Sequence, residues 1–577
     1  MDNNKRFNPY ISVDAEEEIV ISGIAGRFPS SDNIKEFQDN LFNKMDLGSE
    51  DHQRWTNCTY EMPPRIGKIN NIEKFDAKYF NMSIEEAHTL DPGTRILLEN
   101  TYATIIDAGV NPVELQGTRT GIVTAMTISD TYLDLVYEKL HVAGLPILGC
   151  SKSMLANKIS YWLNVTGPSY NIDTACSSSH FAMVEAYNLI RSGICDAAIV
   201  ASVNLCFHPL VTRQFYRLGV LSGDGYCKPY DEEGTGYMRS EAATVVFLQK
   251  AKDARRIYAT FIYGKTNCDG FKEEGITFPS LDKQKLLLEK FYKECNVSPR
   301  ELSYLEAHAT GTIAGDPVEL QAIDEALCIK RDFPLLIGSV KSNIGHSEPV
   351  SGLCQIAKVL IAMETGIIPP TIHLKHPRKN MTAIIEGRVK IVTEPTEWKG
   401  GYVGINSFGF GGANSHILLK SNSKIKVNKT NNNLPKLVVI SGPTEEAVKI
   451  MLNDIQSRST DVEYISLLHH IHSGNIKDHP YRGYIIAGPK ITNNAIIKRR
   501  CNLCTKRPIC FIFSGIGSQY FNMGRALMEF PVFAKAIQKC DTVLEPYKIF
   551  VTGILLNNGN ILNNVVNLFV SLIGLQN

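Results

Sequence analysis

The sequence lacks the features that mark several large functional classes. Its 60 Lys and Arg nearly balance its 59 Asp and Glu, which leaves a formal net charge of +1. No field of one sign is therefore available to hold a nucleic acid or an anionic membrane. No apolar run approaches the roughly 20 residues of a membrane-spanning helix, and the N-terminus has no apolar segment of the secretory kind. We therefore expect a cytoplasmic protein that binds neither nucleic acid nor membrane.

Cofactor signatures are also missing. There is no P-loop, and Gly409-Phe-Gly-Gly-Ala-Asn414 lacks the last glycine of a dinucleotide-binding GxGxxG. Cys501 and Cys504 form a lone CxxC, with no second pair and no nearby histidine pair to complete a zinc site. We expect no bound cofactor and no metal, and we interpret the 14 scattered cysteines as mostly free, buried thiols.

The 577 residues are too many for one core, so about two to four domains are expected. Apolar strand-like runs alternate with helical patterns up to Lys420, which predicts an α/β layered fold. The polar stretch 421–433 predicts a linker. Expected elements are strands near 18–26, 197–203, 243–248, 258–263, 335–340, 437–441, 484–487 and 508–514, and helices over 84–108, 180–193 and 444–456.

The first candidate for chemistry is Cys176. It lies in Asp173-Thr-Ala-Cys-Ser-Ser-Ser179, between an expected strand and an expected helix. Unpaired N–H groups at a helix N-terminus stabilise a thiolate, which predicts a lowered pKa for this thiol. A cysteine at a helix start is more often structural, so the position by itself does not establish catalysis.

Two histidines occupy polar turns after apolar strands. His308 lies in Glu306-Ala-His-Ala-Thr-Gly-Thr312, and His346 lies in Lys341-Ser-Asn-Ile-Gly-His-Ser-Glu348. Ligands bind at the open ends of the strands of α/β sheets. A glycine-rich loop, residues 404–416, could bring a backbone N–H to a developing oxyanion. Each of these segments also has a purely structural interpretation when taken singly.

Together, and in this order, the four segments resemble the β-ketoacyl synthases of the thiolase-like group, through DTACSSS, EAHxTGT, KSNxGH and SFGxGGxNxH. The resemblance covers roughly residues 18–420. Three longer stretches, residues 214–231, 266–280 and 338–352, are similar to the animal-type multifunctional fatty acid synthase. The implied fold is a thiolase-like duplicated α/β/α/β/α arrangement, which dimerises with a second copy through the synthase domain.

The resemblance implies a role for each matching residue. Cys176 is the acyl-carrying nucleophile, with His308, His346 and Lys341 as catalytic partners. The backbone N–H groups of Cys176 and Phe410 form the oxyanion hole. Thr310 and Thr312 bind the pantetheine arm, and Phe408 and Phe410 line and gate the pocket. Acyl and malonyl groups arrive as thioesters of phosphopantetheine on an acyl carrier protein, or of CoA.

The C-terminal part is similar to the next domains of that family. We expect a tail at 1–17, synthase halves at 18–255 and 256–420, a linker at 421–433, an α/β linker domain at 434–506, and the start of a malonyl/acyltransferase at 507–577. The Gly515–Gln519 loop would supply the transferase's oxyanion donor from Gln519. The transferase serine is not reached, which predicts a fragment or a truncated gene product.

Some positions depart from the family pattern. Ala309 replaces a usual glycine, and a positive φ there would strain the backbone by about 1 kcal/mol or more. Ala413 replaces Thr or Ser, His180 replaces an aliphatic residue, and Asp91–Arg95 departs from DPQxR. The alternatives to a fatty acid condensing enzyme are an iterative polyketide synthase domain and a non-catalytic dimerising fragment.

Overall fold

The computed structural model describes the chain from residue 17 to 576 with gaps at 51–53, 56–60, 139–143, 423–435, 460, 473–475, 477–478, 488–495, 499–507, 509, 511, 514, 516–519, 521–522 and 557–563. The chain divides into two compact units, residues 1–425 and 426–577. Each unit is described by itself.

The first unit contains two copies of one five-strand arrangement. In the first copy the order across the sheet is β1-β7-β6-β4-β5, and in the second it is β8-β15-β14-β9-β10. In both copies each neighbouring pair among the first three strands is antiparallel, and the last three strands are parallel. The strands of the first copy are β1 (Ile19–Arg27), β4 (Thr120–Ala125), β5 (Ser169–Ile172), β6 (Ala197–Asn204) and β7 (Ala242–Lys250).

The second copy repeats this chain order with β8 (Ala259–Cys268), β9 (Leu302–Glu306), β10 (Leu335–Gly338), β14 (Tyr402–Phe408) and β15 (Ala413–Ser421). Strand β12 (Val389–Ile391) extends it beyond β10. Strands β1 and β8 pair with each other, with Ile19 opposite Phe261, and join the two copies. The expected duplication is therefore present as a repeated strand order.

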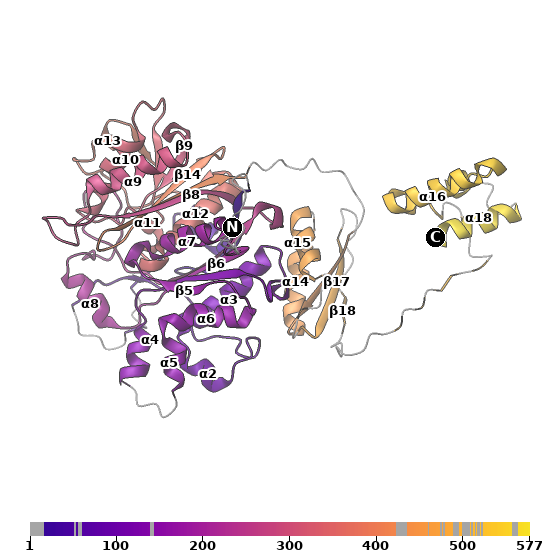
Figure 1. Ribbon diagram of the computed structural model, residues 1–577, viewed down its shortest axis with the longest axis horizontal. Coiled ribbons are helices and arrows are strands. Elements are labelled where there is room, and N and C mark those ends of the chain that lie inside the picture. Colours follow the sequence, from indigo (N-terminus) through magenta and orange to yellow (C-terminus); the bar gives the residue numbers. More distant parts are fainter. Residues whose placement is uncertain are drawn as a thin grey trace, which may run out of the picture. The chain divides into compact units, whose positions relative to one another are not determined.

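Helices cover the sheets in three layers (Figure 1). Helices α3 (Pro92–Asp107) and α6 (Lys152–Leu163) pack on the outer face of the first copy. Helices α9 (Leu281–Glu294) and α10 (Gly315–Leu327) pack on the outer face of the second copy. The middle layer holds α7 (Ser178–Arg191) and α12 (Ser351–Thr365). The α/β/α/β/α expectation is confirmed.

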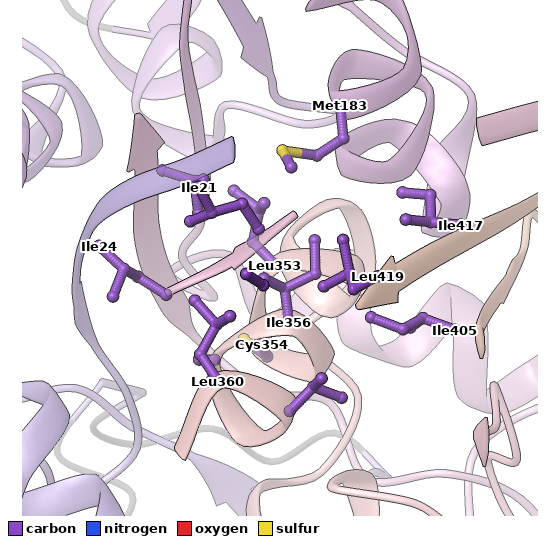
Figure 2. Packing of buried hydrophobic residues seen from close by; sticks show 14 of the residues in the cluster. Ile21, Ile24, Met183, Leu353, Cys354, Ile356, Leu360, Ile405, Ile417 and Leu419 are labelled. Atoms are coloured by element: carbon purple, nitrogen blue, oxygen red, sulfur yellow. The ribbon is translucent and has the colours of Figure 1, made fainter. Parts of the chain in front are cut away.

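The middle layer is mostly apolar, because it faces a sheet on both sides, and the polar side chains buried in it include His180, Gln355 and Lys358. Met183 of α7 and Leu353, Ile356 and Leu360 of α12 point into one cluster with β1, β14 and β15 (Figure 2). Such two-sided burial explains why every residue of α12 from 351 to 362 is buried, where an amphipathic helix would expose one face.

The prediction of one continuous helix over 84–108 was wrong in one respect. The structure has two helices, α2 (Ile84–Thr89) and α3, separated by an extended Leu90. Pro92 occupies the first turn of α3, and the Asp91 carboxylate accepts a hydrogen bond from the N–H of Gly93 at 2.7 Å. A proline disfavours helical backbone at the preceding residue, and aspartate caps a new helix.

The second unit begins with an antiparallel sheet of β16 (Lys436–Gly442), β17 (Tyr481–Ala487) and β18 (Ile496–Lys498). Helices α14 (Glu445–Ser457) and α15 (Val462–His472) cover it. Later helices are α16 (Pro531–Leu544), α17 (Val551–Leu556) and α18 (Val565–Gln576), which share a small core. The division of this unit at residue 507 stays a prediction.

Two expectations fall largely outside the described residues. The CxxC at Cys501 and Cys504 and the loop residue Gln519 are not described. Within the strand expected at 508–514, the described residues Pro508, Cys510, Ile512 and Phe513 belong to no helix or strand.

Candidate active site

The sequence motifs meet because of the repeated topology. Cys176 follows β5, the third strand of the first copy, and Lys341 and His346 follow β10, the third strand of the second. His308 follows β9, and Phe410 follows β14. Strands β10, β9 and β14 are mutually parallel, so the segments after them emerge at one edge of the sheet.

A cavity of about 700 Å³ opens at this edge. Seven of the eight predicted site residues line it, and Lys341 does not. These seven are Cys176, His308, Thr310, Thr312, His346, Phe408 and Phe410. Lys341 is buried outside the cavity wall. Its cation lowers the pKa of His308 and of His346 through space.

The turn that carries Cys176 has an unusual backbone. Ala175 has φ of 54°, in the left-handed region, where an alanine is found only when its surroundings hold it. The hydroxyls of Ser351 and Ser407 both donate to the carbonyl oxygen of Cys176, at 3.0 and 3.1 Å. One hydroxyl comes from α12 and the other from β14, so two elements of the second half fix the position of a nucleophile that the first half carries.

The predicted lowering of the Cys176 pKa was wrong. Burial raises the pKa of Cys176 to about 12, and the carboxylate of Glu348 adds to this rise. The N–H groups of Phe410 and of Cys176 and the cation of Lys341 lower it by less. Cys176 itself lies in a short 3-10 turn, Ala175–Ser177, and α7 starts only at Ser178. Desolvation therefore outweighs the helix terminus, and the resting side chain is a thiol.

Two backbone donors converge on this sulfur. The N–H of Phe410 and the N–H of Cys176 itself both lower the pKa of the Cys176 thiol, so both lie close to Sγ. The loop that supplies Phe410 can come this close only because residue 409 is glycine. A Cβ on Gly409 would lie 2.4 Å from the carbonyl oxygen of Thr174. An oxyanion hole is built from backbone donors of this kind, and that role for Cys176 and Phe410 stays a prediction.

The two histidines form a compact pair. The rings of His308 and His346 have centroids 5.4 Å apart and are nearly perpendicular. Burial, together with the Lys341 cation, holds the pKa of each imidazole well below 6.5. Both rings are therefore neutral at physiological pH, and each carries one N–H that can donate to a substrate oxygen.

Sequence reasoning missed the residues that hold the His308 loop. The Glu319 carboxylate accepts the N–H groups of His308 and Ala309, at 2.8 and 2.7 Å. The Asp316 carboxylate accepts the N–H groups of Thr310 and Gly311, at 3.1 and 3.0 Å. The sequence signal for this support is the pair Asp316 and Glu319, three positions apart in the first turns of α10 and directly after the loop.

The strain expected at Ala309 does not arise. Its backbone is outside the left-handed region, and the positive φ of this loop, 83°, falls at Gly311. Ala309 is buried, and its N–H is bonded to Glu319. His180, the other unusual residue, is buried beside α12, where a Cβ on Gly352 would meet its ring at 2.3 Å.

The described residues contain neither a membrane-spanning helix nor a metal-binding cluster. No helix among them is both long and apolar enough to cross a membrane. No group of three or more His, Cys, Asp or Glu side chains among them could hold a metal ion.

The duplicated layers and the Cys-His-His cavity define the thiolase-like class of condensing enzymes. Comparison with sequence families agrees. The models described as "Beta-ketoacyl synthase, N-terminal domain" and "Beta-ketoacyl synthase, C-terminal domain" match residues 16–254 and 258–375. "Ketoacyl-synthetase C-terminal extension" matches 377–486, and "Acyl transferase domain" matches 510–577. The chain belongs to the β-ketoacyl synthase family, in its animal-type fatty acid synthase branch.

Individual relatives fall in two groups. A fatty acid synthase sequence of the goose Anser anser anser is 46% identical over 351 residues, which are 61% of this chain and all of that sequence. A phenolphthiocerol/phthiocerol polyketide synthase of Mycobacterium tuberculosis is 31% identical over 97% of this chain. The chain spans 32% of that synthase.

Solved structures place the fold in the same family. The ketosynthase from module 6 of the bacillaene synthase of Bacillus subtilis matches with a TM-score of 0.73 and 30% identity, over 82% of each chain. The OzmH KS7 ketosynthase domain of Streptomyces albus matches with a TM-score of 0.73 and 26% identity, over 82% of this chain and 86% of that one.

Proposed function

We propose that this chain catalyses the decarboxylative condensation of an acyl group on Cys176 with a malonyl thioester, as the β-ketoacyl synthase of a fatty acid synthase. One observation carries the proposal. The Cys176 sulfur shares one cavity wall with the Phe410 loop, whose backbone N–H lowers the pKa of the thiol, and with two neutral imidazoles.

In the first stage the Cys176 sulfur attacks the carbonyl carbon of an acyl thioester. The new S–C bond forms, the old thioester bond breaks, and the thiol proton passes to the departing pantetheine or CoA thiol. The N–H groups of Cys176 and Phe410 stabilise the tetrahedral oxyanion. Because burial raises the pKa of Cys176, the sulfur loses its proton during this step rather than before it.

In the second stage a malonyl thioester enters the cavity. Loss of carbon dioxide leaves an electron pair on the thioester as an enolate, and the N–H groups of His308 and His346 stabilise its oxygen. The carbanion attacks the acyl carbonyl, the bond to Cys176 breaks, and the β-ketoacyl thioester departs. The released thiolate takes a proton from solvent, because its pKa lies far above 7.

Other residues hold the substrates and the charges. Lys341 is buried near Glu306 and Glu319, and its cation favours the neutral state of both imidazoles. Thr310 and Thr312, whose hydroxyls lie 3.3 Å apart, bind the pantetheine arm. Phe408 is buried, whereas Phe410 is 40% exposed, so Phe410 forms the gate of the pocket.

The wider setting follows from the family. The acyl and malonyl groups are carried by phosphopantetheine on an acyl carrier protein, the synthase domains pair as a homodimer, and the protein works in the cytoplasm without a bound cofactor. A polyketide synthase domain is the second candidate, because a polyketide synthase is similar over 97% of this chain. Product analysis with malonyl-CoA separates the two.

The experiment is a mass-spectrometric search for the acylated residue. The purified chain is treated with acyl-CoA or with a thiol-directed inhibitor of condensing enzymes, and the peptides are mapped. Selective adducts on Cys176, with the exposed Cys268 as an internal reference, support the proposal. Even labelling of the cysteines, or none, supports the non-catalytic alternative instead. Cys176→Gln should abolish condensation and retain malonyl decarboxylation.

A further inference from the structure

A carboxylate stands in the cavity wall and has no part in the mechanism above. Glu348 lines the cavity together with Cys176. It follows His346 by two residues and has φ of 50°. A non-glycine residue in this conformation is held there by its surroundings.

The surrounding that holds Glu348 is a buried ion pair. Arg239 donates from Nε and Nη2 to the two carboxylate oxygens, at 2.6 and 2.9 Å. Its Nη1 donates to the hydroxyl of Thr212 at 2.9 Å. The Arg239 side chain is 2% exposed and that of Glu348 is 9% exposed. Glu348 belongs to the described cavity wall and Arg239 does not, so the pair presents its negative end to the substrate.

Arg239 is the cation that pairs with Glu348, and it lies behind the wall rather than in it. The acidic residues that line the cavity are Asp269, Asp316, Glu319 and Glu348, without a Lys or Arg among the described lining residues. Asp269 is paired with Lys272, and Asp316 and Glu319 accept backbone N–H groups. After burial, the Glu348 carboxylate makes the largest contribution to the raised pKa of Cys176. It also raises the pKa of Tyr237.

We propose that Glu348 is a specificity-determining residue that disfavours transfer of carboxylate-bearing acyl groups to Cys176. This inference rests on the proposed function. The first stage needs a neutral acyl chain on the sulfur, whereas the malonyl group is anionic and must stay on its carrier thiol. Like charges brought together in a desolvated site are strongly unfavourable, and such repulsion is a common means of specificity.

The test compares acyl groups of equal length. Butyryl-CoA, succinyl-CoA and the neutral amide succinamoyl-CoA are incubated with the chain, and the Cys176 adduct is followed by mass spectrometry. We expect succinamoyl to transfer at least about tenfold faster than succinyl. Equal rates overturn the inference about Glu348. Failure of butyryl-CoA to acylate Cys176 instead overturns the proposed function.

Variants assign the discrimination to this side chain. In Glu348→Gln the preference for succinamoyl over succinyl should fall by about tenfold, whereas Glu348→Asp, which keeps the charge, should retain it. Unchanged discrimination in Glu348→Gln contradicts the proposal. If Glu348→Gln does not fold, the double variant Arg239→Met with Glu348→Gln removes both members of the pair. If that variant still prefers succinamoyl over succinyl, the proposal for Glu348 is also contradicted.

Discussion

The imidazoles of His308 and His346 stand at 89° to each other with centroids 5.4 Å apart. In the described residues neither ring nitrogen of His346 has a hydrogen-bond partner, and the same holds for Nδ1 of His308. Two neutral rings that share a cavity wall and retain free hydrogen-bonding capacity are prepared to bind an oxygen that the protein itself does not supply.

Removal of either ring should therefore affect decarboxylation more than acylation. We expect His308→Ala and His346→Ala each to slow malonyl-CoA decarboxylation by about 10²-fold or more. Butyryl transfer to Cys176 should change far less. The assay is carbon dioxide release, with adduct mass as the second readout. His88→Ala, at an exposed position on α2, is the matched control. Equal losses in both stages would assign the rings another role.

The neutral state of these rings predicts a simple pH dependence. Because the pKa of each imidazole lies well below 6.5, neither gains a proton between pH 8 and pH 6. Decarboxylation by Cys176→Gln should stay nearly constant over this range. A decline with an apparent pKa near 6.5 would show that the rings are solvated.

The oxyanion site depends on the contact between Gly409 and Thr174. The Cβ of Gly409→Ala would meet a backbone oxygen at 2.4 Å, which cannot rotate away, so the Phe410 N–H must move. We expect acylation of Cys176 to fall by about 10²–10³-fold. Gly223→Ala is the control, because nothing lies within 4 Å of its added Cβ. Retained acylation in Gly409→Ala would exclude Phe410 as the donor.

The protonation of Cys176 can be measured directly. Burial raises its pKa to about 12, so the thiolate fraction should rise about tenfold per pH unit. The rate of iodoacetamide labelling at Cys176, read by peptide mass spectrometry, should rise accordingly from pH 7 to pH 9. A labelling rate that stops rising near pH 7 would instead show that Cys176 is already a thiolate there, as its position near a helix start predicts.

His180 gives a prediction on stability. It is fully buried, and neither ring nitrogen has a partner within the described chain. We expect His180→Leu to raise the free energy of unfolding by about 1–2 kcal/mol at pH 8, because an unpaired buried polar group is removed. His416→Leu should destabilise the protein. His416 contacts Asn406 at 2.6 Å and Tyr292 at 3.1 Å.

The same variant has a defined pH signature. Burial lowers the pKa of His180 to about 3, so between about pH 6.5 and 3 the unfolded chain binds the additional proton. The free energy of unfolding is therefore unaffected by this titration above pH 6.5 and decreases as the pH falls below it. From pH 8 to 5.5 the wild type should lose about 1.4 kcal/mol more than His180→Leu. Denaturant titrations at both pH values measure this difference, and equal losses would contradict the burial of the ring.

Most of the local structure could be read from the residues. The run of strands, the helix after Cys176 and the glycine-rich loop at 404–416 follow from apolar patterns and turn residues. Asp91-Pro92 also indicates the break between α2 and α3. The longer helical pattern of apolar residues across it nevertheless predicts one continuous helix. Boundaries of this kind depend on two adjacent residues and are easily overridden by a longer pattern.

The charge states could not be read in this way. Position at a helix start favoured a low pKa for Cys176, whereas burial and Glu348, which is 172 positions further along the chain, raise it. Desolvation depends on everything packed around a group, and Coulomb energy depends on distance through space. Neither quantity is encoded by the neighbours of Cys176 in sequence.

Local sequence patterns established which residue types were available and which turns carry them: a thiol, two imidazoles and a glycine loop, each placed after a strand. The tertiary structure alone decided that they share a cavity, that Lys341 stays behind its wall, and that a paired carboxylate stands beside the sulfur. The physical reason is that two copies of one strand order, joined through β1 and β8, bring distant turns together, and the burial so created sets their protonation.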